Sequence, residues 1–374
     1  MKEIARRPIK AAHFVLLPEM VFSPLNDAIV NGLLESGYLV DIYTPEPLPE
    51  FGKYGPNVTF HPVEFGMRWL LKKAFSPSWR QYQLFSGTAE RPFAFVGLLA
   101  ALHRRRYFLL VEEIKSGSYY GDDPEYLKRL YRWVIRRAQF CVVNDESRIG
   151  LLKDYASIQD AQGIMVYPSC FRQPPPPADR DTLRSEWGLP HNGLVLGVSG
   201  GFNETAGAEW LLKAFCQNPS LYLVVQSVTL PSFCKLLLKH IQGAERLYLQ
   251  PDWPGWREAW REIWSTAPAV DIGLAIYLNP APQFQNMGIS SNRLCMYLSM
   301  GVPIIASRQP SFQFIEEYDC GIMVGDAREF AAAIDRIATR LPVMRENARR
   351  CAREYIRAPE HFVELRQRIS RLDT

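Results

Sequence analysis

The sequence predicts an α/β protein with two domains, each built on a parallel β-sheet covered by helices. Apolar runs of strand length alternate with segments of helical period through the first half of the chain. A second alternating series starts near residue 193, beyond a run of four prolines at residues 174–177. The 374 residues are 47% hydrophobic, which is enough to bury two cores of ordinary domain size.

The first half opens as a strand–helix–strand unit. Residues 12–17 form an apolar run, residues 25–36 have a helical period that stops at Gly37, and residues 38–43 form the next apolar run. Alternation of this kind is typical of a parallel sheet whose strands are joined by helices. Further along we expect helices at 93–104, 123–137 and 145–155, and strands at 107–111, 140–143 and 164–167.

The second half repeats the pattern. We expect a helix at 207–215 and strands at 193–198, 221–226, 246–249, 271–276, 302–306 and 321–324. The last stretch, residues 342–372, is expected to be helical with a break or kink at Ala358 and Pro359, because proline cannot continue a helix undisturbed.

The composition changes between the two series. A run of prolines is stiff and extended, as a connector between domains should be, so we expect a linker at residues 174–190. An alternative is a surface loop within one domain. The linker separates an N-terminal domain, residues 1–173, from a C-terminal domain, residues 191–358.

Charge and cysteine content exclude several function classes. The net charge is +4, from 43 basic and 39 acidic residues, which is too balanced for a general nucleic-acid binder. The seven cysteines are scattered and show no CxxC pair, which favours reduced thiols over disulfides or a metal site. No apolar run reaches the ~20 residues that span a bilayer, and the first one is too short for a signal peptide. We therefore expect a cytoplasmic protein.

One segment, residues 288–307, predicts an anion-binding site. Ser290 and Ser291 supply N-cap chemistry for a helix that ends at Gly301, ahead of Pro303 and an apolar strand. The first turn of such a helix has free backbone N–H groups and the positive end of the helix dipole. With the adjacent Arg293, these donors suit a phosphate group.

The same segment resembles the donor-binding signature of GT-B glycosyltransferases, especially the bacterial surface-polysaccharide enzymes or a divergent relative of them. A family loop of the type SNKL leads into a helix carrying EYMAxGxPVIA. The chain matches it at Ser291, Asn292, Arg293, Leu294, Tyr297, Leu298, Gly301, Pro303, Ile304, Ile305 and Ala306. Two acidic positions of the family signature are occupied here by Gly288 and Met296.

The resemblance implies two Rossmann-like domains whose parallel sheets face an interdomain cleft. It implies a donor-binding C-terminal domain and an acceptor-side N-terminal domain, to which residues from about 359 to 374 return. It also implies contacts between the donor and Ser290, Ser291, Asn292, Arg293 and Tyr297.

A second glycine-rich element follows the strand at 193–198. Gly200, Gly201, Phe202 and Asn203 lie between that strand and the next expected helix, where backbone amides can approach a diphosphate. Glycines also occur in ordinary strand-to-helix turns. We interpret this element as part of a binding site because the segment at 288–307 lies in the same domain. Tyr277 follows the strand at 271–276 and is a candidate contact for the nucleobase or sugar, because ligands lie beyond the carboxyl ends of parallel strands.

Transfer with inversion requires a general base near the acceptor hydroxyl, whereas retention can use the leaving phosphate itself. Glu112 and Glu113 follow the apolar run at 107–111, and Glu19 follows the first strand. These three carboxylates are the candidate bases. The alternative for each is a solvated surface residue or a salt bridge.

The N-terminal half carries cations interleaved with aromatic residues, at 67–85, 104–106 and 126–137. This texture fits either an amphipathic surface for peripheral membrane contact at the inner face of the membrane, or solvated helix faces around a core stripe. No recognised RNA-binding motif accompanies it, so nucleic acid is not an expected partner.

The resemblance implies a glycosyltransferase that moves a sugar from a nucleotide-sugar donor to a glycan or lipid-linked acceptor in cell-surface polysaccharide synthesis. The donor is a substrate, and we expect no tightly bound cofactor and no metal. Two alternatives stay open: a catalytically silent GT-B subunit, favoured by the residues at 288 and 296, and a nucleotide-sugar epimerase of the same architecture.

Overall fold

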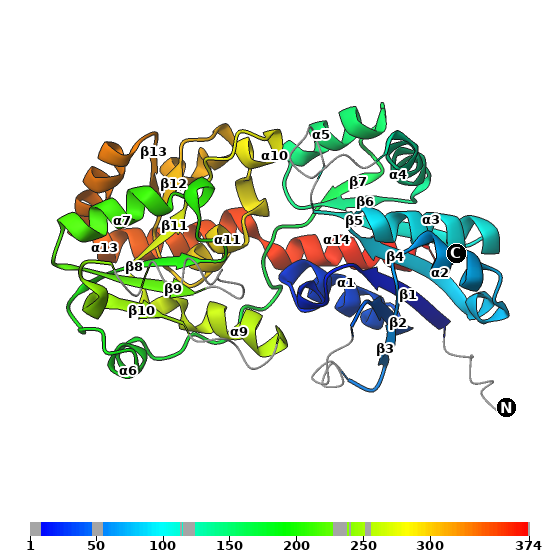
Figure 1. The fold of residues 1–374 in the computed structure, drawn as a ribbon, viewed down its shortest axis with the longest axis horizontal. Helices are drawn as coiled ribbons and strands as arrows, with labels where there is room; N and C mark the ends of the chain where they lie inside the picture. The colour runs from blue at the N-terminus through cyan, green and yellow to red at the C-terminus, as the bar shows by residue number, and fades with distance from the viewer. Residues whose placement is uncertain are drawn as a thin grey trace. The chain divides into compact units, whose positions relative to one another are not determined.

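The computed structural model describes residues 9–46, 55–112, 114, 124–226, 238, 241–250 and 256–372. The chain divides into two compact units (Figure 1). Unit 1 comprises Met1–Arg172 together with Ala358–Thr374, and unit 2 comprises Gln173–Arg357. Each unit is built on its own parallel sheet, as the alternating pattern predicts.

The sheet of unit 1 has seven strands in the order β3-β2-β1-β4-β5-β6-β7, and every recorded pairing is parallel. The order reverses between β1 and β4, which makes this the switch point of the sheet, where open α/β sheets bind ligands beyond the carboxyl ends of their strands. The strands are β1 (Ile9–Val15), β2 (Tyr38–Thr44), β3 (Val58–Pro62), β4 (Tyr82–Thr88), β5 (Arg106–Val111), β6 (Cys141–Val143) and β7 (Ile164–Val166).

Crossover helices connect these strands, and Ser23 caps the first of them by accepting from Asn26 N. The helices are α1 (Pro24–Glu35), α2 (Met67–Ala74), α3 (Glu90–His103), α4 (Glu125–Arg137) and α5 (Ser147–Ala156). Leu130 and Trp133 of α4 pack against the core, and Val134 is fully buried within it. The apolar stripe of α4 therefore faces inward, which favours the core-stripe interpretation for this helix.

The last helix, α14 (Ala358–Ser370), packs on unit 1, and Figure 1 shows it in red beside α1. Arg366 forms an ion pair with Glu35 at 3.5 Å, and Ser370 Oγ lies 3.1 Å from Ser36 Oγ. Arg106 Nη1 donates to the carbonyl oxygen of Leu372 at 2.9 Å. The C-terminal segment is thus an integral part of the N-terminal α/β unit.

Unit 2 contains a six-stranded parallel sheet in the order β10-β9-β8-β11-β12-β13. Its strand order reverses between β8 and β11, which defines the switch point of this sheet. The strands are β8 (Leu194–Ser199), β9 (Leu221–Gln226), β10 (Leu247–Leu249), β11 (Ile272–Ala275), β12 (Ile304–Ser307) and β13 (Gly321–Val324).

The helices of unit 2 are α6 (Arg180–Glu186), α7 (Ala208–Gln217), α9 (Trp256–Thr266), α10 (Pro282–Gln285), α11 (Asn292–Ser299), α12 (Phe314–Glu317) and α13 (Ala327–Cys351). The last begins well before residue 342, because Asp326 caps it by accepting from Arg328 N and Glu329 N, and Pro342 lies inside it. A π-helical turn (Ala352–Ile356) follows, and Arg357, with a φ of +49°, separates it from α14. The break therefore falls directly before the expected Ala358 and Pro359.

Three elements of unit 1 are absent from the sequence prediction: β3, α2 and the central strand β4. Strand β4 reads YQLFSGT, in which polar and small residues interrupt the apolar run that marked the other strands. All of its residues except Gln83 are nevertheless buried, because β4 lies between β1 and β5 and has helices packed against it. Burial of this strand comes from its neighbours rather than from its own composition.

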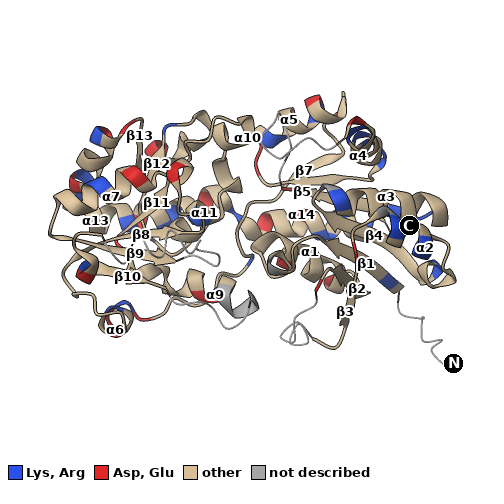
Figure 2. Cartoon of the chain, in the orientation of Figure 1, with Lys and Arg blue, Asp and Glu red and all other residues tan. Residues whose placement is uncertain are grey.

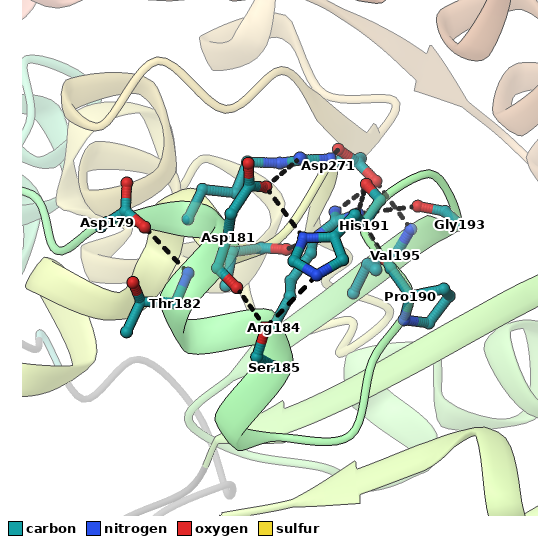
Figure 3. Close-up of polar contacts among 12 residues, drawn as sticks. Asp179, Asp181, Thr182, Arg184, Ser185, Pro190, His191, Gly193, Val195 and Asp271 are labelled. Carbon is teal, nitrogen blue, oxygen red and sulfur yellow. Dashed lines mark hydrogen bonds and ion pairs between the residues drawn. The ribbon is translucent and has the colours of Figure 1, made fainter.

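The expected linker at 174–190 is corrected by the structure. Residues 180–186 form α6, which Asp179 caps by accepting from Thr182 N at 2.8 Å. Arg184 on this helix is fully buried, and its Nη2 donates to Asp271 Oδ2 at 2.6 Å (Figure 3). Residues 180–186 are thus a helix packed in unit 2, and the connector ends before this helix.

Candidate functional site

The candidate site of unit 2 lies at its switch point, beyond the carboxyl ends of β8 and β11. Strand β8 runs into Gly200, whose φ of +80° is a left-handed backbone conformation that glycine adopts without strain. The Gly200 amide donates to Gln226 O at 2.9 Å, which ties the turn to the end of β9. The chain therefore turns sharply at the point where a ligand can approach the backbone.

The expected anion-binding loop forms the start of α11. Residues Gly288–Ser290 make a short 3-10 helix, and Ser291 caps α11 by accepting from Leu294 N at 3.2 Å. Ser290 Oγ donates to the carbonyl oxygen of Met287. The N-cap chemistry expected of Ser291 is thus present, and Ser290 stabilises the preceding turn instead.

Arg293 joins the loop to the glycine turn. Its Nη2 donates to Gly201 O at 3.2 Å, and its guanidinium lies over the Tyr277 ring at 5.3 Å. Arg293 Nη1 and Asn292 Oδ1 are buried and have no hydrogen-bond partner among the described residues. Since buried polar atoms are normally hydrogen-bonded, these two atoms have the capacity to bind a polar ligand.

Tyr277 is held at both ends. Its hydroxyl lies 2.5 Å from Ser291 Oγ, and its backbone amide donates to Ser307 Oγ at 3.1 Å. The structure thus brings together Gly200, Gly201, Tyr277, Ser291 and Arg293, which come from three separate parts of the sequence. A cation over an aromatic ring beside a glycine turn can bind an anionic group attached to a flat ring or sugar.

Two polar residues that shape this loop were missed in the sequence. Gln309, which is buried, accepts from Met287 N at 3.0 Å and donates to Phe284 O at 2.7 Å and to Ser307 Oγ at 3.1 Å. Ser311 Oγ accepts from Gly288 N at 3.0 Å. The rule that selected Tyr277, a polar residue at the carboxyl end of a strand, would also have selected Ser307.

Three expected contact residues have other roles in the structure. Phe202 is 3% exposed and belongs to the core of unit 2, and Asn203 Oδ1 accepts from Ala206 N at 3.0 Å as a cap. Tyr297 is fully buried, and its ring lies where a side chain on Gly273 would stand. Burial raises the pKa of the Tyr297 hydroxyl above its usual value. These three side chains therefore have structural roles in packing and capping next to the site.

The two positions at which the resembling family carries acids are apolar here. Met296 is 1% exposed and buried in α11, and Gly288 presents a backbone amide to Ser311. The polar groups at the start of α11 are instead the hydroxyl of Ser291, the amide of Asn292 and the guanidinium of Arg293.

The three candidate bases belong to unit 1. Glu112 is half-buried directly after β5, and its carbonyl oxygen accepts from Arg148 Nη1 at 3.3 Å. The backbone of Glu19 lies in a 3-10 helix (Pro18–Met20) that follows β1, one of the two strands at the switch point. The side chain of Glu19 and the whole of Glu113 lie outside the described residues.

Comparison with solved structures reveals the architecture to which this site belongs. The chain superposes on sucrose-phosphate synthase of Thermosynechococcus elongatus with a TM-score of 0.70 at 14% identity, covering 97% of this chain and 99% of the other. HepE of Anabaena in complex with UDP-glucose gives 0.73 at 12% identity, covering 96% and 99%. A glycosyltransferase of Rickettsia africae gives 0.71 at 12% identity, covering 97% and 98%.

The chain has a GT-B fold. A protein of Listeria monocytogenes assigned as a UDP-N-acetylglucosamine 2-epimerase shares it, with a TM-score of 0.60 at 11% identity, covering 96% of this chain and 95% of the other. No protein-family model and no curated protein sequence matches the chain. The GT-B fold is therefore preserved here in a divergent sequence.

Two further properties concern ions and membranes. Among the described residues, no group of three or more His, Cys, Asp or Glu side chains could hold a metal ion. Within the same part of the chain, no helix is long and apolar enough to cross a membrane.

Proposed function

We propose that the protein is a glycosyltransferase that uses a nucleotide sugar as donor, with the nucleotide diphosphate bound at the switch point of unit 2. The observation that carries the proposal is the convergence of Arg293 and the Gly200–Gly201 turn, with Arg293 Nη1 and Asn292 Oδ1 left without described partners. The solved neighbours support it, because HepE was crystallised with UDP, with UDP-glucose and with UDP and glucose.

Arg293 would stabilise the charge that builds on the departing nucleotide diphosphate. A guanidinium is planar and can bind two phosphate oxygens at once, which a lysine cannot do. The N–H groups at the start of α11 would add donors and a favourable dipole. Tyr277 would hold the Arg293 side chain in place, because its ring packs against the guanidinium and its hydroxyl is hydrogen-bonded to Ser291 Oγ.

Thermal shift against a panel of nucleotide diphosphates and nucleotide sugars tests the donor site. A ligand at a hundred times its Kd raises the stability of the folded state by about 2.7 kcal/mol. We expect one nucleotide class to stabilise the wild type and Arg293→Ala to weaken its binding by about tenfold to a hundredfold, because a charge-assisted hydrogen bond contributes about 1.5–3 kcal/mol.

The matched control is Arg340→Ala, which removes an arginine from an exposed ion pair with Asp319 on the same unit. Arg293→Lys keeps the charge but removes the planar fork, so it should recover part of the affinity. Equal nucleotide affinity in the wild type and Arg293→Ala would overturn the assignment of the site.

For an inverting transfer, we propose a carboxylate of unit 1, from Glu113, Glu112 or Glu19, as the general base. Each glutamate replaced by glutamine keeps its size and loses the ability to take a proton. The variant that abolishes turnover while nucleotide binding at unit 2 persists identifies the base. If all three turn over normally, the base lies elsewhere or the reaction is retaining.

We propose a glycan or lipid-linked acceptor in cell-surface polysaccharide synthesis, and a cytoplasmic reaction. The motif at residues 288–307 supports the first. Buried reduced thiols support the second: Cys141, for example, is free, and burial raises its pKa to about 12. Incubation of the enzyme and its donor with candidate acceptors, followed by mass spectrometry of the glycan products, tests the acceptor class.

The epimerase hypothesis is supported by the structural similarity to the Listeria monocytogenes protein. An epimerase converts the nucleotide sugar without any acceptor, whereas a transferase releases nucleotide diphosphate in an acceptor-dependent way. Product analysis with and without acceptor separates the two. If no nucleotide at millimolar concentration stabilises the protein, the result would instead favour a catalytically silent GT-B subunit.

A further inference from the structure

Large apolar side chains stand exposed at one end of unit 1. Leu71 and Phe75, on and directly after α2, are 63% and 73% exposed, and Leu102, near the end of α3, is 44% exposed. Leucine and phenylalanine on a monomer surface are usually scattered, whereas Leu71 and Phe75 lie one helical turn apart on the same face. Their exposure therefore needs an explanation.

The exposure follows from how α2 packs. Leu70 and Ala74 are buried against the core of unit 1, and Trp69 packs beside them. The face that remains outward carries Arg68, Leu71, Lys72 and Phe75, at the i, i+3, i+4 and i+7 positions of a helix. The helix thus presents apolar and cationic side chains together to solvent.

Hydrogen bonds hold the end of α3 next to the end of α2. His103 Nε2 lies 2.7 Å from the carbonyl oxygen of Ala74, and Trp79 Nε1 donates to Lys73 O at 2.7 Å. Arg105 Nη2 donates to Arg80 O at 3.0 Å. The His103 contact places the end of α3, which carries Leu102 and Arg104, beside the end of α2. We call the set Arg68, Leu71, Lys72, Lys73, Phe75, Leu102 and Arg104 the α2 surface.

The segment that carries the α2 surface is predominantly basic. Residues 64–106 contain eight arginines and lysines and two glutamates. Figure 2 shows basic residues, in blue, along α2. The whole chain carries only four more basic than acidic residues, so the cationic excess is concentrated in this segment.

We propose that the α2 surface docks the protein on a bilayer that contains anionic lipids. Leu71, Phe75 and Leu102 would enter the boundary between headgroups and acyl chains, while the flanking cations would face lipid phosphates. An amphipathic helix binds at this boundary through the same combination of apolar area and positive charge. Helix α4 takes no part, because its apolar stripe is packed inside unit 1.

Vesicle co-sedimentation tests this docking with the full chain. We expect the wild type to bind vesicles of phosphatidylcholine that contain about 30% of the anionic lipid phosphatidylglycerol. High salt should release it from these vesicles. Leu71→Ser with Phe75→Ser should lower the partition coefficient at least about tenfold, as should Lys72→Gln with Lys73→Gln. Binding to neutral vesicles should be weak.

The control is Val343→Ser with Val363→Ser, which removes two other exposed apolar side chains, 56% and 45% exposed. Thermal unfolding checks that every variant folds, and nucleotide binding at unit 2 should stay unchanged in all of them. Salt-independent binding, equal binding to neutral vesicles, or unchanged binding by the Leu71 and Phe75 variant overturns the proposal. So does light scattering that shows a wild-type dimer lost in that variant, because the α2 surface would then join two copies.

Discussion

Replacing Asp271 by asparagine should destabilise unit 2 strongly. The Asp271 side chain is 2% exposed and accepts four hydrogen bonds. Arg184 Nη2 donates at 2.6 Å and Val195 N at 2.9 Å (Figure 3). Arg345 Nη2 donates at 2.8 Å and Arg180 Nη2 at 3.2 Å. Arg184 also donates to the carbonyl oxygens of Ala269, Pro190, His191 and Gly193. One carboxylate thus connects α6, β8, β11 and α13.

The magnitude follows from what asparagine leaves behind. Arg184 is fully buried, so without the carboxylate its charge stays in the interior and loses its hydrogen-bonded ion-pair partner. The amide of asparagine would also point N–H donors at donors already present. Breaking a buried ion pair in this way costs about 3–5 kcal/mol, a large part of the 5–15 kcal/mol that stabilises an ordinary domain.

Because two units need not unfold together, the assay should report on unit 2 alone. Hydrogen exchange of β8 and β11 amides in increasing urea, read by mass spectrometry, gives the free energy of opening of this sheet. The matched control is Glu346→Gln, since Glu346 is also bound by two arginines, Arg349 and Arg353, but is exposed. Exposed pairs contribute about 0–1 kcal/mol. A loss in Asp271→Asn within about 1 kcal/mol of the control would refute the reasoning.

Two further predictions concern buried residues of each sheet. Burial lowers the pKa of His13 from 6.5 to about 4, so the folded state binds this proton more weakly than the unfolded state. Its contribution is complete above pH 6.5 and is lost as the pH falls toward 4, by about 3 kcal/mol at about 1.36 kcal/mol per pH unit. Urea titrations from pH 7 to 4 should therefore be flatter in His13→Gln, and an identical pH slope would contradict this. A Cβ at Gly273 would lie 2.3 Å from the Tyr297 ring, so Gly273→Ala should lower the free energy of unfolding by about 1–3 kcal/mol. The control Gly163→Ala should be neutral, because a Cβ there has nothing within 4 Å. Equal Tm values for the two variants would show that the ring can move aside.

The elements that sequence reasoning located share a local cause. The strand–helix alternation, the Ser291 cap and the turn at Gly200 are encoded within a few neighbouring residues, through side-chain period, N-cap oxygen and left-handed φ. The loop at 288–293 and the turn at 200–203 were combined into one predicted site because both lie in the same domain.

Where local composition is ambiguous, sequence reasoning failed. Strand β4 has too few apolar residues to be seen alone, and α6 follows four prolines that predict a connector. Both are decided by distant partners: β4 by pairing with β1 and β5, and α6 by the ion pair between Arg184 and Asp271.

The sequence by itself determined that the chain forms two parallel-sheet units, that Ser291 caps a helix and that the chain turns at Gly200, because hydrophobic period and capping act over one or two turns of chain. The tertiary structure alone decided that Arg293 reaches Gly201, that Tyr297 lies in the core, and that Leu71 and Phe75 stay outside it. These outcomes depend on strand order and on which helix face finds a partner, and both are set by contacts between residues far apart in the chain.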